Sequence, residues 1–430
     1  MGRLPPAALW LAAAACGRFG FDFVEGSGSN TMSPDATGVP DDTGIPAVAC
    51  PPIAMQAGTM VSTITQLRTA IANASQNETI LLADGVYNTS TTIEVNAPDV
   101  TIRSASNHAD AVIIDGQGQA NPIFYFRQLH TSLIAVTLRN TGQDAIVVEP
   151  FDATTVLRNA NIYDVTFTDI RGPAVRAKSY QSLATTEYAD YGKLQCSRIG
   201  HTLPNDCGSD GVFGVRLMGV RGWEIRNNYF AGRCAAARVR AIWADKGARN
   251  IVISDNVFSD NGNNILMGGA ALRTYPDTLP AGCTGPPDAW GGLVCNNRIA
   301  GLGVPARANE DFEEGIALWT ACDTYVLHNT VVSPAGTETL ENIEYRFTGT
   351  YAHLLNNLLE ADPVARDGGT IDIASTNVRY ASTADFVNAA AGDLRLTHAL
   401  ALGAPINDCL TDAAGKPRNA GAPTPGAYEP

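Results

Sequence analysis

The segments WEIRNNYF at 223–230 and IVISDNVF at 251–258 align residue for residue, with an asparagine at the sixth position of each. Three further copies follow: LVCNNRI at 293–299, YVLHNTV at 325–331 and AHLLNNLL at 352–359. The shared asparagines are Asn228, Asn256, Asn297, Asn329 and Asn357, and they lie 28, 41, 32 and 28 residues apart. A unit that recurs at this spacing is typical of a solenoid, in which each unit packs only against its neighbours.

A second short apolar segment precedes most copies, and it alternates apolar and polar residues as a β-strand does. These segments lie at 146–148, 175–177, 215–217, 242–244, 316–318 and 343–345. One unit of two or three strands cannot bury its apolar face alone, whereas coils stacked about 4.8 Å apart can. We interpret the repeated asparagines as a ladder of side-chain amides at a bend, each hydrogen bonding to the next.

This pattern, over residues ~60–380, resembles the right-handed parallel β-helix superfamily that includes pectate lyases, chondroitinase-B-like lyases and polygalacturonases. The resemblance implies an all-β solenoid, for which we place the β-helix at 51–385. Ile64, Leu67, Ile71 and Ala74 have helical spacing, so a short helix is expected to cap the N-terminal end. Residues 386–430 resemble the segment that follows bacterial surface β-helices, and we expect them to cap the last coil.

The first residues have the pattern of an export signal. Arg3 precedes an apolar stretch at 7–15, and the sequence AAACG at 13–17 resembles a lipoprotein signal in which Cys16 carries the lipid. Ala13 departs from that pattern, where leucine is usual, and the alternative is ordinary cleavage near Ala15. Residues 16–50 read as an acidic flexible tether. We therefore expect an exported protein, lipid-anchored at a bacterial membrane or secreted.

Charge and cysteine content limit the kinds of partner and the redox compartment to be expected. The formal net charge of −14 argues against a nucleic-acid partner for the surface as a whole, and there is no run of 18 apolar residues to cross a membrane. With Cys16 lipidated, eight of the nine cysteines remain for disulfides. The short separations predict that Cys196 pairs with Cys207 and Cys283 with Cys295, as closures of inserted loops.

Alternation indicates which side chains leave the core. If the apolar residue that opens each segment points inward, two outward columns follow. The first column is Val147, Arg176, Arg216, Trp243, Ala317 and Glu344; the second is Glu149, Lys178, Met218, Asp245, Trp319 and Arg346. The segment at 265–267 would add an intervening coil.

The outward columns suggest a binding face for an acidic polysaccharide. Three consecutive coils would present Arg176, Lys178, Arg216, Trp243 and Asp245, with Trp319 and Arg346 farther along. Indole rings can stack on sugars while guanidinium groups hold carboxylates. We expect Arg216 and Trp243 to be exposed. The alternative is a solvated face of chance charges on a non-catalytic structural or adhesive module. In both cases we expect a monomer.

A lyase would also need a base and a group that neutralises the uronate carboxylate. Arg216 suits the second role, and Lys178, crowded by Arg176, suits the first; Lys246 is a second candidate base. No cofactor is required, although Ca²⁺ could bind the acidic run Glu310, Asp311, Glu313 and Glu314, whose alternative is a solvated loop. Hydrolysis has less support, because the Gly-His-Gly and Arg-x-Lys motifs of polygalacturonases are missing.

Overall fold

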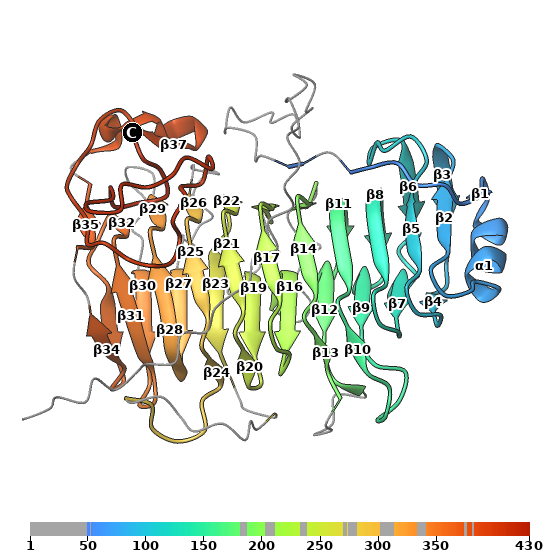
Figure 1. Cartoon of the computed structure of the whole chain (residues 1–430), viewed down its shortest axis with the longest axis horizontal. Coiled ribbons are helices and arrows are strands. Elements are labelled where there is room, and N and C mark those ends of the chain that lie inside the picture. Colours follow the sequence, from blue (N-terminus) through green and yellow to red (C-terminus); the bar gives the residue numbers. More distant parts are fainter. Residues whose placement is uncertain are drawn as a thin grey trace, which may run out of the picture. The chain divides into compact units, whose positions relative to one another are not determined.

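Short parallel strands wind into stacked coils (Figure 1), and each coil pairs with its neighbours strand by strand. The structure is a computed structural model that describes residues 50–51, 53–180, 187–202, 211–232, 239–269, 273, 282–301, 314–332, 341–373, 376–380 and 382–430. These residues lie in one compact unit. None of the helices in this part of the chain is long and apolar enough to cross a membrane.

One wall of the solenoid is a ten-stranded parallel sheet, which carries the two predicted columns. Its strands are β4 (Ile93–Val95), β7 (Phe124–Phe126), β9 (Ile146–Val148), β12 (Val175–Ala177), β16 (Val212–Met218), β19 (Arg240–Asp245), β23 (Asn263–Gly268), β27 (Glu314–Trp319), β30 (Glu341–Arg346) and β33 (Val364–Arg366). The strand β23 is the intervening coil that the sequence indicated at 265–267.

The other walls form one continuous sheet of two ladders, because β8 (Ser132–Thr141) and β11 (Asn161–Ile170) run through both. The other strands of the first ladder are β1 (Thr59–Val61), β2 (Thr79–Leu82), β5 (Thr101–Ser104), β14 (Lys193–Gln195), β17 (Glu224–Arg226), β21 (Val252–Ser254), β25 (Leu293–Cys295), β28 (Ala321–Leu327), β31 (Tyr351–Leu355) and β34 (Thr370–Ile373). Those of the second ladder are β3 (Gly85–Asn88), β6 (Val112–Asp115), β15 (Arg198–Gly200), β18 (Tyr229–Ala231), β22 (Val257–Ser259), β26 (Arg298–Ala300), β29 (Thr330–Val332), β32 (Leu358–Leu359) and β35 (Val378–Arg379).

Short pieces complete the architecture. Two-residue strands lie between the ten-stranded sheet and the first ladder: β10 (Leu157–Arg158), β13 (Ala189–Asp190), β20 (Ala248–Arg249) and β24 (Ala289–Trp290). The C-terminal hairpin consists of β36 (Phe386–Asn388) and β37 (Asp393–Leu396), with the 3-10 helices η2 (Thr383–Asp385) and η3 (Ala389–Ala391).

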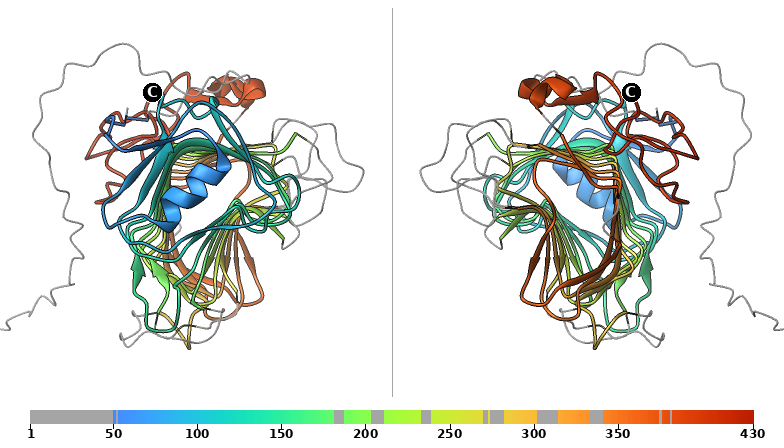
Figure 2. Two further views of the ribbon diagram at one scale, coloured as in Figure 1. Left: turned by 90° about the vertical axis from the view of Figure 1, so that its right-hand side faces the viewer. Right: turned by 90° about the vertical axis from the view of Figure 1, so that its left-hand side faces the viewer.

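The predicted N-terminal helix is α1 (Ile64–Ala72). The Thr63 hydroxyl accepts a hydrogen bond from the Gln66 N–H, which satisfies one of the free donors of the first turn. Leu67 and Ile71 are buried against the first coils. Seen along the stacking axis, α1 lies across the end of the solenoid (Figure 2), so it covers apolar side chains that an open end would expose to water.

The core is built of like residues stacked in register. Val175, Val215, Ile242, Ile265, Ile316 and Ile343 form one buried column through six coils. Each member repeats the environment of the one before it. The inward positions predicted from the sequence are therefore confirmed.

The asparagine ladder is present at the corner between the two ladders of the large sheet. The side-chain amide of Asn228 donates to the side-chain oxygen of Asn256 at 3.0 Å, and the same contact continues through Asn297, Asn329 and Asn357 to Asn377. The residue before each ladder asparagine has a left-handed backbone conformation. Five of these residues are Asn227, Asp255, Asn296, His328 and Asn356, and the sixth, before Asn377, is Thr376. Asparagine, aspartate and histidine tolerate this conformation better than most residues, which explains the recurring polar pair.

The predicted disulfide pairings are wrong. Cys196 pairs with Cys50, Cys283 with Cys322, and Cys295 with Cys409, at sequence separations of 146, 39 and 114 residues. Stacking brings distant coils and terminal segments together, so proximity in sequence is a poor guide to pairing. Cys207 lies outside the described residues, as does Cys16.

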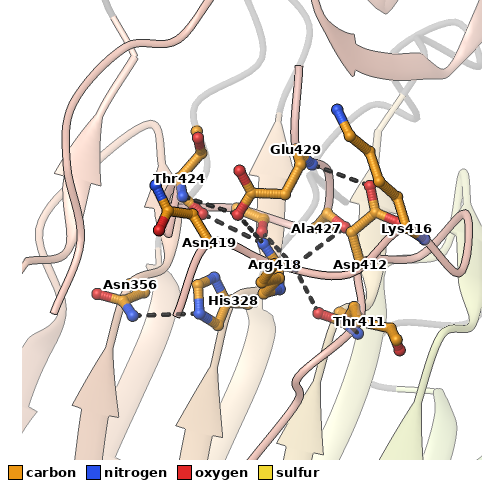
Figure 3. Close-up of polar contacts among 12 residues, drawn as sticks. His328, Asn356, Thr411, Asp412, Lys416, Arg418, Asn419, Thr424, Ala427 and Glu429 are labelled. Carbon is orange, nitrogen blue, oxygen red and sulfur yellow. Dashed lines mark hydrogen bonds and ion pairs between the residues drawn. The ribbon is translucent and has the colours of Figure 1, made fainter. Parts of the chain in front are cut away.

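The C-terminal segment packs along the side of the last coils. Phe386, Leu394 and Leu396 lie against Ala300, Val332 and Leu358 of the second ladder. Figure 3 shows the polar centre of the following stretch, where Arg418 donates to the carbonyls of Thr424, Gly426 and Ala427 and pairs with Glu429 at 3.3 Å. The disulfide to Cys409 adds a covalent attachment.

His328 lies buried beneath this segment, with its Nε2 atom 3.1 Å from the side-chain amide nitrogen of Asn356. Burial and the charge of Arg418 lower the pKa of His328 from 6.5 to about 3. Between these values the unfolded chain binds a proton that the folded chain does not, so the fold loses stability as the pH falls.

We expect wild type to lose about 1.4 kcal/mol of unfolding free energy per pH unit below about pH 6, relative to His328→Asn. Asparagine tolerates the left-handed backbone at this position and does not titrate. Urea unfolding of both proteins at several pH values measures this difference. Parallel pH profiles would show that His328 is not the titrating group.

Candidate functional site

The strand register of the ten-stranded sheet reproduces both predicted columns. Arg176 pairs in register with Arg216, and Arg216 with Trp243. Leu266 of β23 then separates Trp243 from Ala317 and Glu344. In the second column Asp245 follows Met218, and Trp319 pairs with Arg346. The sequence therefore predicted which side chains share each column of the sheet.

Guanidinium groups and indole rings alternate along this face. The guanidinium carbon of Arg216 lies 4.4 Å from the ring centre of Trp243. Arg240 lies between the two indoles, 5.6 Å from Trp243 and 5.0 Å from Trp319. Arg346 follows at 5.7 Å from Trp319. We call Arg176, Arg216, Trp243, Arg240, Trp319 and Arg346 the ring–cation strip.

Hydrogen bonds fix both indoles. The Trp243 Nε1–H donates to the carbonyl of Gly268 at 2.7 Å, and the Trp319 Nε1–H donates to Glu344 at 3.0 Å. A side chain at Gly268 would collide with the backbone of Trp319. The glycine therefore lets the rings lie close together over the intervening coil. Rings held in this way lose little freedom when a ligand binds.

Buried carboxylates accompany the cations. Arg176 pairs with Asp144 at 2.7 Å, and Lys178 with Glu149 at 3.3 Å. Arg216 donates to Asp245 at 3.1 Å. The side chain of Arg216 is only 13% exposed, and Trp243 is half-buried. The prediction that Arg216 and Trp243 are exposed is therefore wrong, because carboxylates of the same and neighbouring coils hold the guanidinium groups against the sheet.

Among the carboxyl groups beside the strip, that of Asp245 has a strongly raised pKa. Burial raises its pKa to about 6, against the opposing charges of Arg216, Lys246 and Arg176. Its Oδ2 atom accepts the bond from Arg216, whereas Oδ1 has no hydrogen-bond partner among the described residues. Such a group changes charge close to neutral pH, which is typical of functional sites.

The two candidate bases have different surroundings. The Lys178 ammonium lies against Glu149, a residue that also accepts hydrogen bonds from Tyr125 and Arg127. Lys246 follows the last residue of β19, in a left-handed turn. Its charge acts on the neighbouring Asp245.

Of the predicted Ca²⁺ ligands, only Glu314 is described; Glu310, Asp311 and Glu313 lie outside the described residues. Glu314 converges with Glu341 and Glu344, with one oxygen of each within 4.8 Å of the others. Burial and the charge of Glu344 raise the pKa of Glu341. Arg366 lies 3.1 Å from both Glu341 and Glu344, so these oxygens would hold Ca²⁺ only after that guanidinium moved away.

Sequence reasoning missed Arg240 and Asp144. Strict alternation places Arg240 on the side of Ile242, yet its guanidinium contacts both indoles on the outer face. A recurring signal was available, since a charged residue stands two positions before the first buried isoleucine in four coils. These residues are Asp144, Arg240, Glu314 and Glu341.

No family model and no curated protein matches this chain. Among solved structures it is similar to pectate lyase Pel9A, with 14% identity and a TM-score of 0.50 over 90% of this chain and 98% of that one. It is also similar to an alginate lyase from Paenibacillus sp. str. FPU-7, with 14% identity and a TM-score of 0.41 over 74% and 99%. A double-mutant tailspike protein of E. coli bacteriophage HK620 matches at 14% identity and 0.46, over 77% and 65%. The likeness to pectate lyase Pel9A is one of fold, a right-handed parallel β-helix.

Proposed function

We propose that this chain is an exported surface protein that binds polysaccharide along the ring–cation strip. The observation that carries the proposal is the alternation of Arg216, Trp243, Arg240, Trp319 and Arg346 along the stacking axis, from β16 to β30. Coils repeat about every 4.8 Å, so a linear polymer lying along the axis would meet rings and cations in turn. The pectate and alginate lyases among the structures of similar fold are consistent with such a partner.

We infer that the polysaccharide is acidic. A uronate carboxylate would compete with Asp245 for Arg216, and the raised pKa of Asp245 makes that exchange easier in mild acid. Protonated Asp245 leaves the guanidinium without its nearest anion. Affinity for a polyuronate should therefore increase as the pH falls from about 7 to about 5.

Catalysis is a second candidate, favoured by Lys246 and Arg216 on either side of Asp245. In an elimination, a neutral lysine takes the proton at C5 of the uronate. The electron pair of that bond forms the C4–C5 double bond, the bond from C4 to the glycosidic oxygen breaks, and the departing oxygen takes a proton from the lysine ammonium or from water. Arg216 would stabilise the carboxylate as charge develops on it. Any Ca²⁺ requirement would fall on Glu314, Glu341 and Glu344.

Replacing Trp319 by alanine should weaken binding of hexagalacturonate or hexaguluronate about tenfold, equivalent to about 1.4 kcal/mol. Tyr229→Ala is the matched control, because Arg198 stacks on Tyr229 at 4.7 Å on the second ladder, away from the strip. Calorimetric titration gives both affinities. Unchanged binding by Trp319→Ala, or equal loss in the control, would contradict the proposal.

Ultraviolet absorbance of unsaturated uronates, followed with and without Ca²⁺, separates the candidate functions. Growth of that absorbance in wild type, and its loss in Lys246→Ala with binding retained, would establish a lyase. Binding without new absorbance would support a non-catalytic binding protein. Absence of both would favour the alternative, a structural or adhesive module.

Export and a lipid on Cys16 remain part of the proposal and rest on the pattern at 1–17. The protein expressed with this segment should incorporate a palmitate analogue and partition into detergent. Cys16→Ser should be unlabelled. A wild-type protein without label would rule out the anchor.

A further inference from the structure

Three aromatic rings gather on the outer face of the first ladder, away from the ring–cation strip. Tyr325 of β28 stacks on His353 of β31, with ring centres 4.3 Å apart and planes 16° apart. Tyr351 meets the same imidazole edge-on at 5.3 Å. The Tyr325 side chain is 36% exposed.

Two carboxylates hold the imidazole in place. His353 Nε2 lies 3.3 Å from Asp323 Oδ1, and Nδ1 lies 3.4 Å from Asp372 Oδ2. The imidazole itself is only 11% exposed. Residues of three consecutive coils, on β28, β31 and β34, therefore hold one face of the Tyr325 ring against the imidazole. The ring is thus held in place before a ligand binds.

The charge around these rings is predominantly negative. Burial raises the pKa of Tyr325 to about 12, and the charges of Asp323, Asp408 and Asp372 contribute. Two carboxylates thus contact the imidazole, and the charge of a third, Asp408, acts on Tyr325. A uronate or sulfated sugar would be repelled here, whereas sugar hydroxyl groups could donate hydrogen bonds to the carboxylates.

We propose that Tyr325, His353, Asp323, Asp372 and Asp408 form a second glycan-binding site, specific for uncharged sugar units. The phenol ring would stack on the C–H face of a sugar, as aromatic rings pack on apolar surface generally, while the carboxylates accept its hydroxyl hydrogens. Because the site lies on the first ladder, it does not depend on the strip of the ten-stranded sheet. Two sites on separate walls would let one molecule hold two glycan segments and gain avidity.

A disulfide contributes to the site. Asp408 precedes Cys409, which is bonded to Cys295 of β25, the strand that pairs with β28. The C-terminal segment therefore brings Asp408 to the rings through a covalent link. Cys409→Ser should weaken binding at this site and leave binding at the strip unchanged.

Maltohexaose, cellohexaose and chitohexaose are suitable probes, with hexagalacturonate for comparison, in calorimetric titrations of the full chain. At least one uncharged probe should bind wild type, and Tyr325→Ala should weaken it about tenfold or more. Tyr325→Phe should retain most of the affinity because it keeps the ring. Trp319→Ala should not affect the uncharged probe, so failure of this site is distinguishable from failure of the strip.

Three results would overturn the proposal: no uncharged probe binds wild type, Tyr325→Ala binds as well as wild type, or hexagalacturonate competes with the uncharged probe for the site. Circular dichroism and thermal melting of Tyr325→Ala establish that the variant is folded. If it fails to fold, Tyr325→Leu repeats the test without the planar ring.

Discussion

Asn297→Ala is expected to lower the free energy of unfolding by about 3–6 kcal/mol. The side-chain oxygen of Asn297 accepts from the backbone N–H of Asn256 at 3.2 Å and from its side-chain amide at 3.0 Å. Its own amide donates to the carbonyl of Ile253 at 2.8 Å and to Asn329 at 3.0 Å. All of these groups are buried, and each one left without a partner costs about 1–3 kcal/mol.

Two controls separate the ladder from a general effect of losing an asparagine. Asn377 is the last rung and only half-buried, so Asn377→Ala should cost less than Asn297→Ala. Asn419 is exposed and bonds only its local turn, so its replacement should change stability by no more than about 0.5 kcal/mol. Urea unfolding followed by circular dichroism gives all three values. Equal costs at the two ladder positions would mean that the amides act independently.

The sequence was sufficient to predict the register of the outward columns because successive coils place the same kind of apolar residue at the same core position. From Val175 to Ile343 each coil supplies a β-branched residue at the same inward position, and a slip of one residue would move it into water. The asparagine ladder was predictable for the same reason. Its amide must find partners at a buried corner, and the next coil always supplies them.

Contacts between side chains of neighbouring coils were harder to predict than the direction, inward or outward, of each side chain along a strand. Asp144 and Arg176 are 32 residues apart in sequence, and Lys178 reaches Glu149 on the preceding coil. The sequence showed a run of cations, but only the stacked structure shows that each has a carboxylate beside it. The disulfides were unpredictable for a related reason, since Cys50 and Cys196 meet across 146 residues of wound chain.

The role of Arg216 in the structure therefore differs from the role expected from the sequence. In the sequence it appeared as an exposed ligand for a sugar carboxylate. In the structure it also compensates Asp245, whose side chain is 2% exposed. A residue with both duties cannot be tested by a binding measurement alone, because its loss changes the fold as well as the ligand contacts.

Arg216→Ala should destabilise the protein by about 3 kcal/mol near neutral pH, since it leaves a buried carboxylate without its nearest cation. The pKa of Asp245 is already raised from 3.8 to about 6, and losing Arg216, which lowers it, should raise it further. The folded state then binds a proton that the unfolded state releases. Acid therefore favours the fold, and the cost of the substitution should shrink as the pH falls from neutral to about 6, below which Asp245 is protonated in both proteins.

The double variant Arg216→Ala/Asp245→Asn separates the two duties of Arg216. Asparagine cannot ionise, so the double variant should regain most of the lost stability and lose the pH dependence that Asp245 causes. Its affinity for hexagalacturonate should remain low, because the guanidinium that holds the sugar carboxylate is still missing. Unfolding free energies and calorimetric titrations measure the two properties separately. If Arg216→Ala were as stable as wild type at neutral pH, Asp245 would not depend on this ion pair, and the strip would be a looser surface than its contacts indicate.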